Sequence, residues 1–448
     1  MTLDPAWVED ASGYRGHADR LFCPASEDEV AEILAAAAGD GVSVTIAGAG
    51  TGLSGGRVAE GGWVVSLENF RRLEIGPGMA RVGAGVLLRD LHAAAGRTGQ
   101  FYGPDPTETT ASIGGNVATN ASGSRSLRYG DTRRNALALR SVLMDGRRLA
   151  VGRGDRLDFP VHPVRKPGTT KHAAGFLLEP GMDWIDLLVG SEGTLGVVTE
   201  VELRLRPRPA SVLAGVVFFD TEVDVLDAVD AWRGLDGIRM LEYFDAGSLE
   251  LLRRLHPETP RRVAALLLEQ ESDDIEAWPA RLEEFHADPG ASWFAVSEAD
   301  RERFRRFRHA LPEAVNDTVR RHGFLKLGSD CAVPLERNRE MMAYYRRRVE
   351  ERFPGRSVIF GHIGDAHLHV NILPASREEF DLGQELMLEF ARHAVVLGGT
   401  VSAEHGLGKR KRHLLAIQCA PEEIEAMREV KRRLDPRWLL GRGNLFLE

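Results

Sequence analysis

An α+β fold in two domains is predicted for this chain by three observations. Its 448 residues exceed what one ordinary hydrophobic core contains, so two domains of roughly 200 residues each are expected. The first half joins short strands with glycine-rich loops, whereas the second half alternates strands with helices. A proline-interrupted strand, RPRPAS at 206–211, separates the halves. The predicted domains are residues 1–208 and 209–420, and residues 421–448 are predicted as a helix and tail that pack back on the first domain.

Composition indicates a globular protein without a nucleic-acid or membrane partner. Hydrophobic residues make up 43% and charged residues 27% of the chain, and the formal net charge of −9 argues against binding to phosphate backbones. No apolar run is long enough for a membrane span, and no signal peptide is recognisable. Three widely spaced cysteines, Cys23, Cys331 and Cys419, fit reduced thiols, so a cytoplasmic location is expected. They are too few for a four-cysteine iron–sulfur cluster.

The first half begins with a helix and a strand that lead into a glycine-rich loop. Ser26 and Glu29 form the capping pattern of an alanine-rich helix that ends at Gly39 and Gly41. The strand VSVTI follows and runs into AGAGTGLSGG, a loop that can present several backbone N–H groups to a diphosphate. Its spacing matches neither a Walker loop nor a G-x-G-x-x-G turn, so a plain glycine-rich turn remains an alternative.

Two further loops rich in glycine, serine and threonine follow in this half. Residues 101–123, FYGPDPTETTASIGGNVATNASG, are predicted as one long irregular loop around a ligand, because such long loops in compact domains are usually functional or disordered. A hairpin turning at Asp145-Gly146 comes next. The last loop, LLVGSEGTLGVVTE, precedes a strongly alternating strand. Three such loops in one domain predict a large polar ligand held by backbone groups.

The second half is predicted to form an antiparallel sheet covered by helices. Its strands are SVLAGVVFF, IRMLEYF and RVAALLLEQ, and a long basic helix covers roughly residues 299–321. Another helix, AYYRRRVEERF, leads into the strand that ends at His362.

The residues best suited to chemistry gather in two later segments, GHIGDAHLHVNILP and GGTVSAEHGLGKRKR. The first predicts two strands joined by a tight turn, so that His367 and His369 share one strand face and His362 can fold back toward them. Glu404 and His405 stand in the second segment, among glycines that let the backbone close around a ligand. Imidazoles and a carboxylate on separate segments suit a divalent metal with an open position. Satisfied polar groups in a tight turn are the alternative.

The glycine-rich loops resemble the FAD-wrapping segments of flavoproteins of the vanillyl-alcohol oxidase and p-cresol methylhydroxylase (PCMH) type. AGAGTGLSGG resembles the diphosphate loop of this family, although Ala47 stands where relatives often carry arginine or glycine. The resemblance spans about residues 20–208 and implies a PCMH-type domain that binds FAD in extended form. The implied FAD-binding residues are Gly48, Gly50, Thr51, Gly52 and Ser54 around the diphosphate, then Pro104, Thr109, Ser112, Gly115, Asn116 and Gly123, with Glu192, Gly193 and Val198 nearer the flavin or adenine. Some relatives attach FAD to a histidine near the first loop; here Arg57 follows the glycine pair and the loop has no histidine, so non-covalent FAD is expected.

The second half resembles the FAD-linked oxidase C-terminal domain of D-lactate, D-2-hydroxyglutarate and glycolate dehydrogenases. The family pattern G-H-x-G-D-G-N-L-H-x-N is matched over 361–371, except that Ala366 and His367 replace Gly-Asn. E-H-G-x-G is matched over 404–408. The roles implied by the resemblance are metal ligation for His362, His369 and Glu404, proton abstraction for His405, and binding of the substrate carboxylate for Arg308 and Lys326. His367 is assigned to substrate binding, with metal ligation or simple polar filling as alternatives.

The expected activity is FAD-dependent dehydrogenation of a D-2-hydroxy acid to a 2-oxo acid, assisted by a divalent metal such as zinc. The metal would acidify the substrate hydroxyl, His405 would take its proton, and the C2 hydride would pass to flavin N5. Arg308 would clamp a carboxylate through two hydrogen bonds. Lys326 needs either Asp330 or a second substrate carboxylate as partner, so D-2-hydroxyglutarate is expected slightly ahead of D-lactate.

Because the chain cannot hold its own iron–sulfur cluster, the reduced flavin must pass electrons to an external acceptor. An electron-transfer flavoprotein, an iron–sulfur subunit, a cytochrome and a quinone all remain open, as does the oligomeric state, with a homodimer among the alternatives. Two other functions are alternatives. One is a flavin oxidase of another alcohol, including a sugar-lactone or alkylglycerone-phosphate enzyme, and the other is a non-catalytic flavin subunit that relays electrons in a larger complex.

Overall fold

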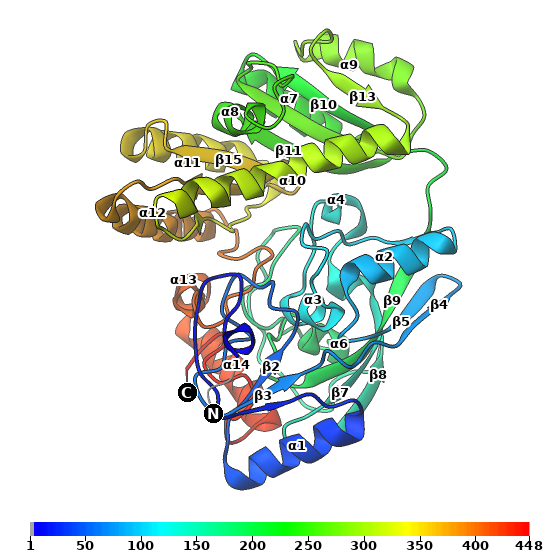
Figure 1. Cartoon of the computed structure of the whole chain (residues 1–448), viewed down its shortest axis with the longest axis vertical. Helices are drawn as coiled ribbons and strands as arrows, with labels where there is room; N and C mark the ends of the chain where they lie inside the picture. Colours follow the sequence, from blue (N-terminus) through cyan, green and yellow to red (C-terminus); the bar gives the residue numbers. More distant parts are fainter. Residues whose placement is uncertain (1–3, 448) are drawn as a thin grey trace.

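The computed structural model describes residues 4–447 and consists of two domains stacked along the long axis of the molecule (Figure 1). A three-stranded parallel sheet and a six-stranded antiparallel sheet belong to the first domain, and a seven-stranded antiparallel sheet forms the second. The predicted α+β class with antiparallel sheets is therefore confirmed. The predicted domain ranges begin at residue 1 and end at residue 448, and these two positions lie outside the described residues.

The first domain opens with α1 (Glu27–Asp40), which begins and ends where its capping residues predict. The Ser26 hydroxyl accepts the N–H of Glu29, and Gly41 closes the helix in the left-handed conformation. The parallel sheet contains β1 (Arg20–Phe22), β3 (Trp63–Ser66) and β2 (Val44–Ala47). The antiparallel sheet contains β4 (Leu73–Gly76), β5 (Met79–Gly83), β9 (Val197–Pro207), β7 (Ala136–Val142) and β8 (Arg148–Gly152), with β6 (Gln100–Tyr102) also paired to β9. Further helices of this domain are α2 (Leu88–Arg97), α4 (Ser126–Tyr129), α5 (Thr132–Asn135) and α6 (Trp184–Leu188).

The segment 101–123 is more regular than the sequence predicts, because it contains the end of β6 and the helix α3 (Ile113–Thr119). Ser112 caps this helix by accepting the N–H of Gly115 at 3.3 Å. Two glycines in its first turn disfavour a helix by propensity, but tertiary packing decides here. A Cβ atom at Gly114 would lie 2.8 Å from the Cβ of Ala84, so glycine lets the helix approach the neighbouring sheet.

The second domain, called the cap here, is a sheet with helices on both faces. In spatial order its strands are β13 (Trp293–Ala295), β10 (Leu213–Phe219), β12 (Ala264–Gln270), β11 (Ile238–Asp245), β15 (Ser357–His362), β16 (His367–Ile372) and β14 (Leu327–Gly328). One face packs on α8 (Ala246–Arg253) and α10 (Glu298–Arg321). The other packs on α7 (Glu222–Trp232), α9 (Trp278–Glu284), α11 (Asn338–Arg352) and α12 (Arg377–Val396). Burial on both faces explains why β10 and most of β12 are continuously apolar rather than alternating.

The chain returns to the first domain after the cap. Helices α13 (Leu415–Gln418) and α14 (Pro421–Leu434) lie beside the first domain in Figure 1. The Val44 N–H then donates to the carbonyl of Leu439 at 2.7 Å, and the Gly441 N–H donates to the carbonyl of Val44 at 2.8 Å. Residues far apart in sequence therefore pair along the edge of the parallel sheet.

Largely buried ion pairs fix the cap against the first domain. Arg125, just before α4, contacts Glu269 on β12 at 2.9 Å and Asp105 at 3.3 Å. Arg239 on β11 contacts the same Glu269 at 2.9 Å. Burial makes such charges costly unless they are paired, so this network favours one position of the cap. Across residues 4–447, every helix is too short or too polar to cross a membrane.

Candidate functional site

A cavity of about 380 Å³ lies where the two domains meet, and its two walls differ in composition. The first domain contributes mainly the backbone of its glycine-rich loops. The cap contributes ionisable side chains. The site residues that the sequence predicts and that the structure places in the cavity wall are Gly48, Gly50, Thr51, Gly52, Ser54, Ser112, Gly115, Asn116, Gly123, Glu192, Gly193, Val198, Arg308, Lys326, His362, His369, Glu404 and His405.

Sheet register brings the predicted histidines together. Strands β15 and β16 form the predicted hairpin, in which His362 lies opposite His367 and Phe360 lies opposite His369. Residues directly opposite in antiparallel strands point to the same face, so all three imidazoles share the face that packs on α10. The ring centroids of His367 and His369 are 4.5 Å apart, and those of His362 and His367 are 5.2 Å apart.

Glu404 completes this cluster from the segment that follows α12. Ligand atoms of His362, His367, His369 and Glu404 all lie within 4.8 Å of one another. Within the described residues, Nδ1 of His367 is buried and has no hydrogen-bond partner. Three imidazoles, one of them with an unsatisfied buried nitrogen, and one carboxylate fit a divalent metal such as zinc.

Neighbouring acceptors fix the orientation of two of these imidazoles. Nδ1 of His362 lies 2.5 Å from the carboxylate of Glu242 on β11, and Nδ1 of His369 lies 2.9 Å from the carbonyl oxygen of Ser329. Each ring thereby keeps Nε2 for a ligand, which is the usual arrangement around protein-bound metals. Burial opposes ionisation of Glu242, but the charges of Arg308 and His362 outweigh it and lower its pKa to about 2.

Asp330 connects the histidine cluster to the predicted base. Its side chain lies 3.2 Å from Nε2 of His367, 3.4 Å from Nδ1 of His405 and 2.6 Å from the hydroxyl of Ser402. Burial lowers the pKa of His405 to about 4, although the charge of Asp330 opposes the shift. His405 is therefore a neutral imidazole at pH 7 and can accept a proton.

The position of His367 differs from its predicted role in substrate binding. The side chain is 0% exposed and does not line the cavity. Its Nε2 lies 3.2 Å from Asp330, and its ring belongs to the cluster of possible metal ligands on the sheet face beneath α10. Its burial favours the alternative of metal ligation, while the predicted contact with substrate stays a prediction.

The two predicted carboxylate-binding cations are held differently. Arg308 on α10 donates through Nε to Glu242 at 2.9 Å and through Nη1 to the hydroxyl of Thr107 at 3.1 Å. Its Nε edge is thus occupied, and the Nη2 atom is left for a ligand. Among the described residues, no carboxylate pairs with Lys326, whose pKa is lowered to about 8 by burial and by Lys411. The alternative that Asp330 pairs with Lys326 is therefore wrong.

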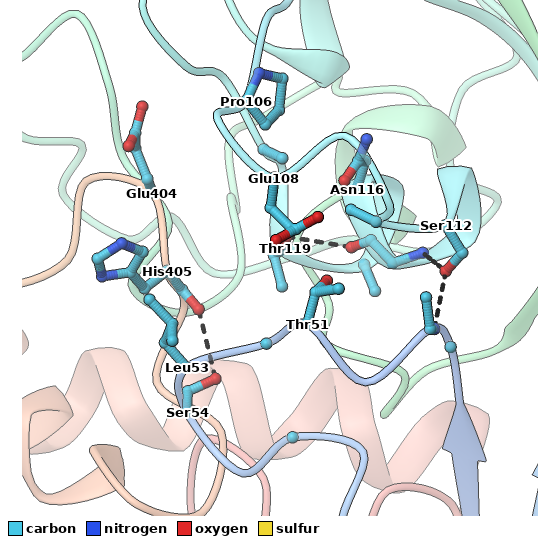
Figure 2. Close-up of a pocket in the computed structure, with 18 of the residues that line it drawn as sticks. Thr51, Leu53, Ser54, Pro106, Glu108, Ser112, Asn116, Thr119, Glu404 and His405 are labelled. Atoms are coloured by element: carbon cyan, nitrogen blue, oxygen red, sulfur yellow. Dashed lines mark hydrogen bonds between the residues drawn. The ribbon is translucent and has the colours of Figure 1, made fainter. Parts of the chain in front are cut away.

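The opposite wall has the features of a diphosphate-binding loop. Within residues 4–447, the N–H groups of Gly50, Thr51 and Gly52 donate to no protein acceptor. Nδ2 of Asn116 is likewise buried without a partner. Figure 2 shows this loop facing α3 on one side and the loop of Glu404 and His405 on the other. Unsatisfied amides around an elongated cavity fit an extended dinucleotide such as FAD.

Two predicted FAD contacts lie outside this wall. Pro104 is buried away from the cavity, and the carbonyl of Thr109 accepts the N–H of Arg89 near the start of α2. Their chain neighbours Pro106 and Thr107 line the cavity instead.

Glu192 does line the cavity, but its carboxylate oxygens are already engaged. They accept the N–H groups of Leu407 and Gly408 at 2.7 and 2.6 Å. In addition, the Ser54 hydroxyl donates to the carbonyl of His405 at 3.3 Å (Figure 2). The FAD-side loops thus hold the backbone of the segment that carries Glu404 and His405.

Three residues of the site are missing from the sequence-based set. Glu242 has a recognisable signal, because it is the lone carboxylate in the apolar strand IRMLEYF, and a buried charge needs a reason. Asp330 is considered above only as a partner of Lys326. Lys171, whose Nζ lies 2.7 Å from Glu404, sits in an irregular segment that offers no pattern.

Comparison with known proteins identifies the class. Residues 208–445 match the family described as FAD linked oxidases, C-terminal domain, and residues 18–152 match the family described as FAD binding domain. A chain with both parts is a two-domain flavoprotein. The protein belongs to the FAD-linked oxidases, and it is an FAD-dependent oxidoreductase, as the sequence predicts.

Individual relatives cover nearly the whole chain. A D-lactate dehydrogenase of Archaeoglobus fulgidus is 31% identical over 94% of this chain and 90% of its own length. A D-2-hydroxyglutarate dehydrogenase of Xanthomonas citri pv. viticola is 32% identical over 95% of this chain and 89% of its own. A solved structure of alkyldihydroxyacetonephosphate synthase superposes with a TM-score of 0.68 at 16% identity, covering 94% of this chain and 76% of that one, and this likeness concerns the fold alone.

Proposed function

We propose that this protein oxidises a D-2-hydroxy acid to the 2-oxo acid with FAD and a divalent metal. The observation that carries the proposal is the position of the histidine–glutamate cluster, at the cap end of the cavity that the FAD-side loops enclose. The relatives named D-lactate and D-2-hydroxyglutarate dehydrogenase support this substrate class.

Each proposed role follows from the contacts of a residue. His362, His369 and Glu404 would hold the metal, and the loop at Gly48–Ser54 would hold the diphosphate of FAD. When bound, FAD supplies a hydride acceptor at N5 and the metal supplies a Lewis acid for the substrate hydroxyl.

The protein side chains bind the acid and move its proton. Nη2 of Arg308 donates to the substrate carboxylate, while Glu242 holds the guanidinium in place. His405 takes the hydroxyl proton as a neutral imidazole, and Asp330 stabilises the imidazolium that results. The cap covers this end of the cavity and limits the access of water.

The proposed FAD is non-covalent and transfers its electrons to an external acceptor. Within the described residues, the histidines lining the cavity are His362, His369 and His405, and all three lie on the cap side rather than in the diphosphate loop. Acid precipitation is expected to release all the yellow chromophore, and colour retained in the pellet would show a covalent link.

An anaerobic screen of D- and L-2-hydroxy acids tests the reaction class. The flavin absorbance is expected to bleach with D-lactate or D-2-hydroxyglutarate and to persist with the L enantiomers. A flavin that bleaches with neither enantiomer would favour the relay-subunit alternative, in which the isolated chain reduces its flavin only through a partner. Preferential bleaching by L-acids would contradict the proposed stereochemistry.

A further inference from the structure

Lys171 is a buried cation that the proposed reaction does not use. The residue is 1% exposed and sits in the irregular segment between β8 and α6, outside both family-matched ranges. Its Nζ lies 2.7 Å from Oε1 of Glu404, 2.9 Å from the carbonyl oxygen of Gly123 and 3.7 Å from Oδ2 of Asp365. Burying a lysine is costly unless the charge is paired and hydrogen-bonded, and these contacts provide both.

The same contacts make the two oxygens of Glu404 unequal. Oε1 accepts three hydrogen bonds, from the Ser122 hydroxyl at 2.8 Å, the Gly123 N–H at 2.8 Å and Lys171. All three donors belong to the first domain. Oε2 instead lies 3.3 Å from Nε2 of His362 and faces the histidine cluster. Oε1 is therefore fully engaged by three donors, whereas Oε2 remains available to a metal in the histidine cluster.

We infer that Lys171 is a positioning residue that presents Glu404 to the divalent metal through one oxygen, Oε2. This inference rests on the metal site of the proposed function. A carboxylate that binds through one oxygen occupies less of the coordination shell than one that binds through both, which leaves room for the substrate. A cation of the FAD domain thus sets the geometry of a metal ligand on the cap side of the cavity.

Two other roles for Lys171 predict different results. A direct substrate contact does not fit, because Lys171 does not line the cavity. A purely structural ion pair would contribute to the stability of the fold but would leave the affinity and coordination of the metal unchanged. Metal affinity therefore separates positioning from simple structural support.

The test uses full-length, FAD-loaded protein stripped of metal and titrated with Zn²⁺ in competition with a chromophoric chelator. Lys171→Met keeps most of the side-chain volume but removes the charge and the donors. Loss of such a supporting partner typically weakens metal binding about 10- to 100-fold, and we expect a Kd increase in this range with FAD content unchanged. Co²⁺ as the probe should also show altered d–d absorption, because Oε1 of Glu404 loses its charged donor and can approach the metal more readily.

Lys409→Met is the matched control. Lys409 is also buried, at 4% exposure, and its Nζ donates to Oδ1 of Asn444 at 2.8 Å. This variant should lose thermal stability while keeping the Kd for Zn²⁺ of the parent protein. If Lys171→Met does not fold, Ser122→Ala removes one of the three Oε1 donors and is expected to raise the Kd severalfold.

The outcomes separate this inference from the proposed function. An unchanged Zn²⁺ Kd and unchanged Co²⁺ bands in Lys171→Met, or in Ser122→Ala if only that variant folds, overturn the role of Lys171. If Lys171 has no such role but His362→Ala abolishes metal binding, the proposed metal site still stands. If His362→Ala also binds Zn²⁺ normally, the metal site itself is wrong, and the inference fails with it.

Discussion

The two walls of the cavity offer different kinds of groups to a ligand. The FAD-side wall works through backbone amides, such as those of Gly50 and Thr51, whereas the cap wall works through ionisable side chains. A backbone wall depends on the shape of the chain and tolerates most side-chain changes that leave this shape intact. A side-chain wall depends on individual residues, so single substitutions there should have the larger effects on catalysis. The following predictions test this difference, from the largest expected effect to the smallest.

Removing the metal should abolish activity while leaving FAD binding unchanged. Dialysis against a chelator is expected to abolish turnover, because the cap wall loses its Lewis acid, while FAD stays bound to the other wall. Activity should return when a divalent ion is added, and the flavin spectrum and metal analysis together measure both losses. Fully active enzyme without a stoichiometric ion would rule out the metal site.

Replacing the proposed base should slow flavin reduction without loss of the bound metal or FAD. His405→Ala is expected to lower the rate of flavin reduction on the order of 10²-fold or more, since a general base is lost. Metal content and FAD content should stay at the level of the parent protein. A rate within a few-fold of that protein would show that another group takes the proton.

Lys326 should distinguish dicarboxylate from monocarboxylate substrates. The cation lines the cavity without a carboxylate partner among residues 4–447, so a second substrate carboxylate would pair with it. Lys326→Met is expected to raise KM for D-2-hydroxyglutarate about tenfold or more and to change KM for D-lactate little. Equal effects on both substrates would exclude this role.

The lowered pKa of Lys326 gives a matching pH dependence. Lysine binds a carboxylate only when protonated, and protonation is lost as pH rises through its pKa of about 8. In the parent protein, kcat/KM for D-2-hydroxyglutarate relative to D-lactate should therefore be constant below pH 8 and fall above it. In Lys326→Met this ratio should be low and independent of pH.

The FAD-side wall should respond only to changes of backbone shape. A Cβ atom at Gly48 would lie 2.7 Å from the hydroxyl oxygen of Ser112, so Gly48→Ala should displace the loop and weaken FAD binding severalfold. Gly39→Ala is the control, because a Cβ there meets no atom within 4 Å. FAD affinity measured by fluorescence should change in the first variant and not in the second.

The sequence predicts the parts of the site that depend on local geometry. The alternation of a strand places His367 and His369 on one face, and the tight turn returns His362 beside them. The capping residues Ser26 and Gly41 likewise predict where α1 begins and ends. The helix α3 is missed, because glycines that favour a loop by propensity are required here for close packing against Ala84.

Strand alternation, turns and capping residues do not predict contacts between distant segments. His362 and Glu242 are 120 positions apart, and Lys171 and Glu404 are 233 positions apart. Each of these partners is an ordinary charged residue in the sequence, and only the assembled domains bring them together. For the same reason the sequence leaves Asp330 as an alternative partner of Lys326, whereas the structure turns Asp330 toward His367 and His405.

The pairing of Val44 with residues 439–441 has a consequence for the order in which the protein is made. The side-chain amide of Asn444 also donates to the carbonyls of Gly56 and Glu192, inside the FAD-side wall. This wall is therefore incomplete until residue 444 has been synthesised, although its first loop emerges from the ribosome early. Nascent chains should expose an unfinished dinucleotide site throughout translation of the cap, so we expect FAD to enter only after these late residues have docked.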